Sequence, residues 1–179
     1  MATPKQVRTW IQQAEADLRA ARVDASDLRP CHQRYWLQQS YEKAIKAYAL
    51  MRWNGDVNQE PQFNRLFLLQ HSPIKTVTET DTPLSKSLHL LRREVQSFIQ
   101  GDLAGVAASL LKIDATTPRH DPEEVSYRYP FLEDGEYVAP AVYEGWDGYQ
   151  GNLLSASGAV ERLLQAVKDE LKLFSRKPK

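Results

Sequence analysis

The sequence predicts an all-α protein: an antiparallel helical bundle of four long helices plus one or two short ones, with a long irregular loop before the last helix. Four separate segments repeat apolar residues every three or four positions, the period of a helix with one buried face. No alternating segment has an evident partner strand. Stripes of this kind are buried pairwise when helices pack into a bundle.

Length and composition predict one globular domain over residues 1–179. The chain is 42% hydrophobic and 26% charged, which is ordinary for a folded domain and unlike a disordered segment. Lys and Arg together number 23, as do Asp and Glu, so the formal net charge is zero. The global positive field that attracts nucleic acid or an anionic membrane is therefore absent, although a local basic face is not excluded.

The sequence also favours a cytoplasmic location. Cys31 is the single cysteine, so no disulfide forms within the chain, as suits a reducing compartment. The first ten residues lack the apolar segment of a secretory signal, and apolar runs are far shorter than the roughly 20 residues of a membrane span. We expect no metal or cofactor, because the chain has neither Cys/His metal spacing nor a Gly-rich phosphate loop.

The first helix is predicted to begin with Thr3 as its cap and Pro4 in its first turn, and to run to about Asp24. The second is predicted from Pro30 to near Trp53. The apolar stripe of the first helix consists of Val7, Trp10, Ile11, Ala14, Leu18 and Ala21.

The second helix is predicted to bury one face and expose the other. Its core stripe consists of Leu37, Tyr41, Ala44, Ile45, Tyr48 and Met51. Glu42, Lys43 and Lys46 are expected on a charged outer face, with Glu42 and Lys46 paired at i and i+4. Tyr35 and Trp36 lie away from the centre of the stripe, which predicts either a partner surface or covering by the long loop.

The middle of the chain is less regular. Residues 63–69 are compatible with two helical turns, and residues 75–82 with a loop or extended segment. Thr82 and Pro83 then begin a third helix, and Gly101 is expected to end it, with Asp102 capping a short fourth helix. One long helix with a tolerated Gly101 is the alternative, at about 1 kcal/mol relative to Ala. The two stripes are Leu84, Leu88, Leu91, Val95 and Phe98, then Leu103, Val106, Ala107, Leu110 and Leu111.

A long loop over residues 114–152 is expected before the last helix. It is rich in Pro, Gly, Asp and Tyr, and loops of this length are often functional. The last helix is marked by Val160, Leu163, Leu164, Val167, Leu171 and Phe174.

The wording QQSYEKAIKAY in the second helix resembles the signature of HEPN domains (higher eukaryotes and prokaryotes nucleotide-binding). Trp10 and the Ala-Asp-Leu of residues 16–18 are similar to the family's first helix, and residues 127–130 resemble its Arg-Tyr-Pro element. Residues 55–83 and 131–152 look like insertions. The matching positions of the second helix are Gln39, Glu42, Lys43, Ala44, Lys46 and Ala47, with Ser40 in place of the usual alanine.

The resemblance implies an antiparallel bundle that is commonly a homodimer. Many HEPN members are ribonucleases of toxin–antitoxin and defence systems, and a minimal nucleotidyltransferase is a frequent partner. It thus implies RNA, a nucleotide or a partner protein as the binding partner of this chain, and no membrane.

Active HEPN members carry an Arg-x(4–6)-His motif, and Arg65 with His71 is the pair here with that gap. The arginine would stabilise charge on the phosphate, and the histidine would assist attack by the ribose 2′-hydroxyl. The alternative is a solvated arginine and a histidine at a helix C-terminus.

Arg128, followed by Tyr129, stands where the family places its arginine, yet no histidine follows His120 in the chain. We therefore expect a binding protein without a clear nuclease motif. Arg128 would bind phosphate or fix the loop. The first alternative is a metal-independent ribonuclease that uses Arg65 with His71, or Arg128 with His89 or His120; the second is a purely structural interaction subunit.

Further binding candidates are the cations Lys43, Lys46, His89 and Arg93. His89 and Arg93 are expected on the exposed side of the third helix at i and i+4, with Arg92 on its flank. A solvated charged face is the alternative reading.

Overall fold

The structure is a computed structural model that describes residues 2–22, 30–53, 86–115, 131–144 and 152–175. The predicted all-α class is confirmed. The described helices are α1 (Pro4–Ala21), α2 (Pro30–Arg52), α5 (Lys86–Ser97), α6 (Ala107–Ala115) and α8 (Leu153–Phe174). A π-helical turn η2 (Phe98–Asp102) and a 3-10 turn η3 (Ala104–Val106) join α5 to α6.

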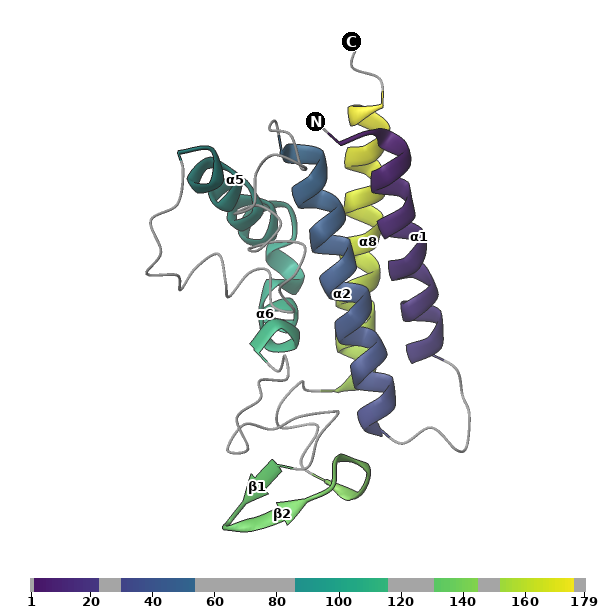
Figure 1. The fold of residues 1–179 in the computed structure, drawn as a ribbon, viewed down its shortest axis with the longest axis vertical. Coiled ribbons are helices and arrows are strands. Elements are labelled where there is room, and N and C mark those ends of the chain that lie inside the picture. Colours follow the sequence, from purple (N-terminus) through teal and green to yellow (C-terminus); the bar gives the residue numbers. More distant parts are fainter. Residues whose placement is uncertain (1, 23–29, 54–85, 116–130, 145–151, 176–179) are drawn as a thin grey trace.

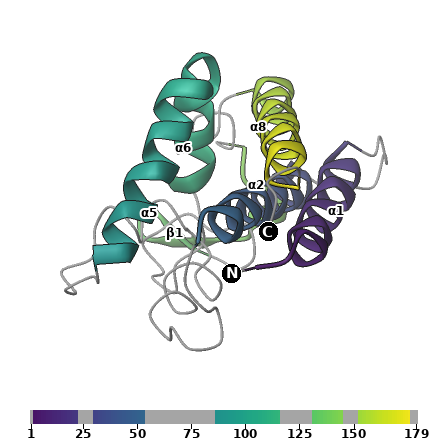
Figure 2. The ribbon, with the colours of Figure 1, turned by 90° about the horizontal axis from the view of Figure 1, so that it is seen from above.

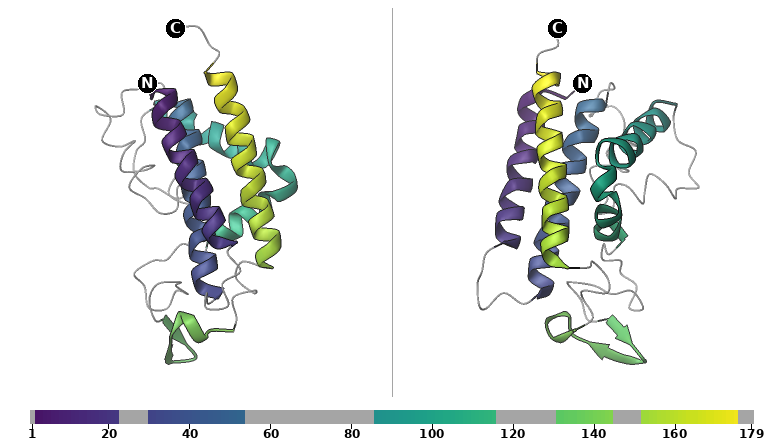
Figure 3. Two further views of the ribbon diagram at one scale, coloured as in Figure 1. Left: turned by 90° about the vertical axis from the view of Figure 1, so that its right-hand side faces the viewer. Right: turned by 180° about the vertical axis from the view of Figure 1, so that it is seen from behind.

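Helix α2 occupies the centre of the molecule (Figures 1 and 2). Helices α1 and α8 pack along one side of it, and α5 with α6 lies along the other. Helix α1 runs antiparallel to α2 and α8, while the path from α5 through α6 returns along α2 (Figure 3). The long helices are α1, α2 and α8, with 18, 23 and 22 residues, whereas α5 has only 12. The predicted third helix, from Thr82 to Gln100, corresponds to α5, and the predicted short fourth helix corresponds to α6; the proposed start of the third helix at Thr82 and Pro83 lies outside the described residues.

The start of α1 follows the prediction closely. The backbone N–H of Gln6 donates to Thr3 Oγ1 at 3.2 Å, and the backbone N–H of Thr3 donates to Gln6 Oε1 at 2.8 Å. This reciprocal pair is a capping box, which satisfies donors that the first helical turn leaves open. Pro4 occupies the first helical position, where its missing N–H costs nothing.

The predicted core stripes of α1, α2 and α8 are buried, apart from Trp10 and Phe174, which are partly buried against the same core. In α8, Asn152 caps the helix by accepting the backbone N–H of Leu154 at 2.8 Å. None of the described helices is both long enough and apolar enough to span a bilayer.

The prediction of a charged outer face on α2 is wrong for two of the three residues assigned to it. Glu42 is 4% exposed and Lys46 is 3% exposed, while Lys43 is partly buried. Because α2 has neighbours around most of its circumference, it also buries positions outside the apolar stripe. Apolar periodicity locates the face that needs a core, but it does not show whether a second layer covers the other face.

The junction after α5 differs from both predicted forms. Gly101 does not end the helix in the left-handed conformation, since the positive φ angles in the described residues belong to Asp134 and Gly135. Asp102 does not cap the next helix either, because the cap position of η3 is Leu103. The chain instead passes through the π turn and the 3-10 turn directly into α6. Leu103 and Leu110 of the predicted stripe are buried, whereas Leu111 is 43% exposed and Ile113 is fully buried instead.

The predicted irregular loop contains a small hairpin. Strands β1 (Phe131–Glu133) and β2 (Glu136–Val138) pair antiparallel, and a 3-10 turn η4 (Pro140–Val142) follows. Asp134 and Gly135 form the turn with φ of 51° and 84°, the two positive values that a type I′ hairpin needs. The Asp-Gly dipeptide carries this signal in the sequence.

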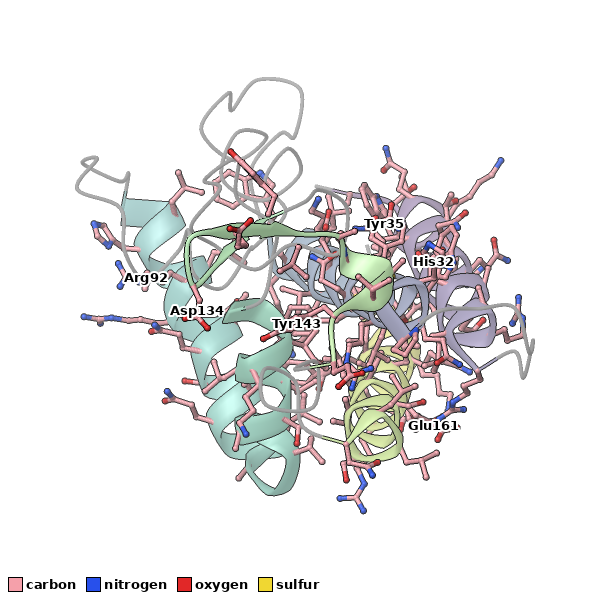
Figure 4. All side chains as sticks on the ribbon, turned by 90° about the horizontal axis from the view of Figure 1, so that it is seen from below. His32, Tyr35, Arg92, Asp134, Tyr143 and Glu161 are labelled. Atoms are coloured by element: carbon pink, nitrogen blue, oxygen red, sulfur yellow. The ribbon has the colours of Figure 1, made fainter. Side chains whose placement is uncertain are left out.

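The hairpin region lies at the end of the bundle where α2 begins (Figures 1 and 4). Val138 and Tyr143 pack with Cys31 and Tyr35 of α2 in a small apolar cluster of their own. Covering by the long loop, rather than an open partner surface, is therefore the outcome for Tyr35. Trp36 packs partly buried against the main core.

The burial of Ala44 predicts a large effect of charge at this position. Ala44 is 0% exposed, and Ala44→Asp would place a carboxylate in the centre of the bundle. We expect this variant to lose at least about 3 kcal/mol of unfolding free energy, measured by urea denaturation. Ala108→Asp on the exposed side of α6 is the control and should cost no more than about 1 kcal/mol. Equal effects of the two substitutions would show that the packing of α2 is misassigned.

Candidate functional site

Several predicted site residues lie outside the described part of the chain. They are Arg65, His71, Arg119, His120, Arg128 and Tyr129. The proposed ribonuclease pair and its composite alternatives therefore stay predictions. Lys43, Lys46, His89 and Arg93 are described, and the structure assigns them to two different regions.

Lys43 belongs to a polar layer between α1 and α2. Its Nζ donates to Asp17 Oδ2 at 2.6 Å and to Gln39 Oε1 at 3.0 Å. Asp17 is only 2% exposed, and its other oxygen accepts from Gln13 Nε2 at 2.9 Å. The carboxylate of Asp17 is thus satisfied from both helices.

Lys46 forms the deepest ion pair of this layer. Its Nζ lies 2.5 Å from Glu42 Oε1, and both side chains are less than a tenth exposed. The same ammonium lies 5.7 Å from the ring centroid of Trp10 on α1, within the range of a cation–π contact. Lys46 is therefore engaged inside the protein and is not open to solvent.

This polar layer contains several of the α1 and α2 residues that resemble the HEPN sequence signature. Lys43 and Lys46 of α2 contact Asp17 and Trp10 of α1, which belong to the similar part of the first helix. Within α2, Gln39 and Glu42 accept hydrogen bonds from these two lysines. Ser40, which stands in place of an alanine, donates to the backbone carbonyl of Ala14 at 2.7 Å.

A groove of about 630 Å³ opens between the C-terminal end of α2 and α5, and we call it the α2–α5 groove. Helix α2 contributes Tyr48 and Arg52 to it, and Trp53, which directly follows this helix, also lines it. Helix α5 contributes Leu90, Leu91, Arg93, Glu94 and Ser97, and the π turn contributes Phe98 and Asp102. Its volume is in the range of about 300–1,000 Å³ that is typical of small-molecule sites.

Aromatic side chains form the buried side of this groove. The rings of Tyr48 and Phe98 stack with centroids 3.9 Å apart and an interplanar angle of 8°. The guanidinium carbon of Arg52 lies 5.2 Å from the centroid of the Tyr48 ring. Burial raises the pKa of Tyr48 above its ordinary value, although the Arg52 cation opposes this change. Tyr48 is therefore a neutral phenol at neutral pH.

Arg52 is oriented by a neighbouring helix. Its guanidinium forms an ion pair with Glu170 of α8, and both side chains are about a third exposed or less. Burial lowers the pKa of Arg52, but interactions with Tyr48, Glu170 and Glu94 raise it by more, so the pKa lies above its ordinary value. Arg52 is thus a fixed positive charge beside the aromatic stack.

The rim of the groove carries polar groups without structural partners. Arg93, Ser97 and Asp102 have no hydrogen bond or ion pair within the described part of the chain, and all three are exposed. A guanidinium binds phosphate or carboxylate groups, whereas a carboxylate accepts from hydroxyl or amino groups. This rim can therefore bind a ligand that carries both an anion and hydrogen-bond donors.

Of the residues that line this groove, the sequence singled out only Arg93 as a binding candidate. Arg93 is exposed on α5 as predicted, as is His89, but His89 does not line the groove. Arg52, Glu94 and Asp102 were not singled out as site residues. They come together only through the packing of α2 on α5 and through the π turn, neither of which is readable from local periodicity.

The charges between α1 and α8 differ from those of the rim because they are paired. Arg22 lies 2.8 Å from Glu161, and Lys168 lies 2.8 Å from Glu15, and all four residues line a smaller groove of about 240 Å³. A hydrogen bond from Arg22 lowers the pKa of Glu161. These pairs connect α1 to α8 and leave few groups for a ligand.

Comparison with protein-family models, curated proteins and solved structures found no match. Among the described residues, no group of three or more His, Cys, Asp or Glu side chains is arranged to hold a metal ion.

The buried position of Lys46 predicts a clear stability effect. Lys46→Met would leave the Glu42 carboxylate inside the protein without its ammonium partner. We expect a loss of about 3–5 kcal/mol in unfolding free energy, measured by chemical denaturation.

Lys172→Met is the matched control, because Lys172 pairs with Asp169 at 2.7 Å on the exposed surface of α8. An exposed pair of this kind contributes at most about 1 kcal/mol. If the two variants are equally stable, the ion pair of Lys46 has no structural role.

Proposed function

We propose that this protein is a HEPN-like helical protein that binds a nucleotide or RNA in the α2–α5 groove and has no nuclease activity of its own. The observation that carries this proposal is the unpaired guanidinium of Arg93 on the rim of a groove with an aromatic floor. The resemblance of α1 and α2 to HEPN domains supports the same class of ligand.

Each part of a nucleotide has a chemical counterpart in this groove. Arg93 supplies a planar set of donors for phosphate, and Arg52 adds a second positive charge. Leu90, which is 54% exposed, and the edges of the Tyr48–Phe98 stack supply an apolar wall for a base or sugar. The ligand is a single nucleotide or an RNA end, because the balanced net charge offers no extended basic surface for a long polyanion.

The biological setting in this proposal comes from the resemblance alone. It is a role in a toxin–antitoxin or defence system, with a minimal nucleotidyltransferase as the partner protein. A gene for such an enzyme beside the gene for this chain would support the setting.

Removing the Arg93 guanidinium tests the binding proposal. We expect Arg93→Ala to weaken binding of adenosine 5′-monophosphate and of a short single-stranded RNA about tenfold, because a charged hydrogen bond to phosphate is lost. Isothermal titration and fluorescence anisotropy measure the two affinities. Arg8→Ala is the matched control, since Arg8 is exposed on α1 and does not line the groove.

Two results would overturn the proposal. One is equal affinity of Arg93→Ala, Arg8→Ala and the parent protein, which would remove the groove as the site. The other is metal-free RNA cleavage by the parent protein that is lost in His71→Ala or Arg65→Ala, which would instead establish the ribonuclease.

We also propose that the protein is a homodimer. The family resemblance supports this state. Size-exclusion chromatography with light scattering should give about twice the 20.5 kDa mass of the chain. A mass of one chain at micromolar concentration would contradict the proposal.

A further inference from the structure

The π turn η2 contributes two residues, Phe98 and Asp102, to the wall of the α2–α5 groove. Turns of π-helix are rare and occur frequently at functional sites, because they insert a residue into a helix and redirect a side chain. Here the turn covers Phe98–Asp102, and the groove is lined by both its first and its last residue. Phe98 is explained by its stacking on Tyr48, whereas Asp102 has no such packing role.

The carboxylate of Asp102 performs no structural task in the described residues. It does not cap η3, whose cap position is Leu103 with no side-chain hydrogen bond. It has no ion pair or hydrogen bond within the described ranges, and the residue is exposed. An ionised carboxylate has only acceptor positions, so a ligand that contacts it must supply donors.

The other charged residues of the groove indicate which part of such a ligand can contact Asp102. Glu94 is a second exposed carboxylate of the groove, and its charge contributes to the field at Arg52 and Tyr48. Arg93 and Asp102 line the same groove and carry opposite charges. A carboxylate repels the anionic group that binds Arg93, so the part of the ligand that Asp102 can contact is an uncharged part with hydroxyl donors.

We infer that Asp102 binds the ribose of a ribonucleotide by accepting hydrogen bonds from its 2′- and 3′-hydroxyls, while Arg93 binds the phosphate. This inference rests on the proposed function, because it assigns the parts of a nucleotide within the same groove. It adds a selectivity that nucleotide binding alone does not require: the groove prefers ribose to 2′-deoxyribose.

The test compares adenosine 5′-monophosphate with its 2′-deoxy analogue by isothermal titration. The parent protein should bind the ribonucleotide about tenfold more tightly, the effect of one hydrogen bond to a charged group. Asp102→Ala should weaken binding of the ribonucleotide more than binding of the deoxy analogue, which loses only the bond from its 3′-hydroxyl, and should thereby abolish the preference for ribose. The control is Glu136→Ala, which removes an exposed carboxylate on β2 outside the groove.

The outcomes separate this inference from the proposed function. Binding of both nucleotides with equal affinity, or a ribose preference that persists in both Asp102→Ala and Asp102→Asn, would overturn the role of Asp102 and leave nucleotide binding intact. Failure of the parent protein to bind either nucleotide would overturn both. Circular dichroism of each variant confirms that affinities are compared between folded proteins.

Discussion

The enclosure of α2 is the constraint on which the rest of this structure depends. A helix with neighbours on most sides has no solvent face for its charged residues, so Glu42 and Lys46 have to be neutralised inside the protein. Removing each ion from water costs several kcal/mol, and only close pairing offsets that cost. Glu42 and Lys46 pair with each other within α2, while α1 adds Trp10 beside Lys46 and Asp17, which accepts from Lys43. These directional contacts fix how α1 lies along α2, which apolar packing alone would leave less defined.

The C-terminal end of α2 positions two residues of the α2–α5 groove. Arg52 is held by Glu170 of α8, and Tyr48 stacks on Phe98 at the start of the π turn. The first contact fixes a positive charge, and the second fixes the position of η2 relative to that charge. A binding site gains affinity when its groups are already placed before the ligand arrives. The unpaired groups Arg93 and Asp102 are carried on α5 and η2, so the packed core also sets their relative position.

Much of the fold follows from local chemistry, which is why the sequence predicts it. The capping box at Thr3, the proline that begins α2 and the stripe of α8 each depend on residues within a few positions of one another. The predictions that are wrong depend on more distant relations. The burial of Glu42 and Lys46 depends on a second layer, and the π turn at Gly101 depends on how α5 meets α2. The hairpin does carry a local signal in its Asp-Gly turn, but strands of three residues give too short an alternation to accompany it.

The same distinction applies to function. Of the α2 residues that resemble HEPN domains, Lys43 and Lys46 contact α1, so part of this pattern serves the packing of two helices. A fold hosts many activities, and an activity has to be argued from a site. In this chain that site combines Arg93 and Asp102 of one helical path with Arg52 and Tyr48 of another. If the α1–α2 polar layer stabilises the fold and the groove binds a ligand, substitutions in the layer should change the unfolding free energy. Substitutions on the rim of the groove should change ligand affinity alone. Lys46→Met and Arg93→Ala therefore test two independent properties of one molecule.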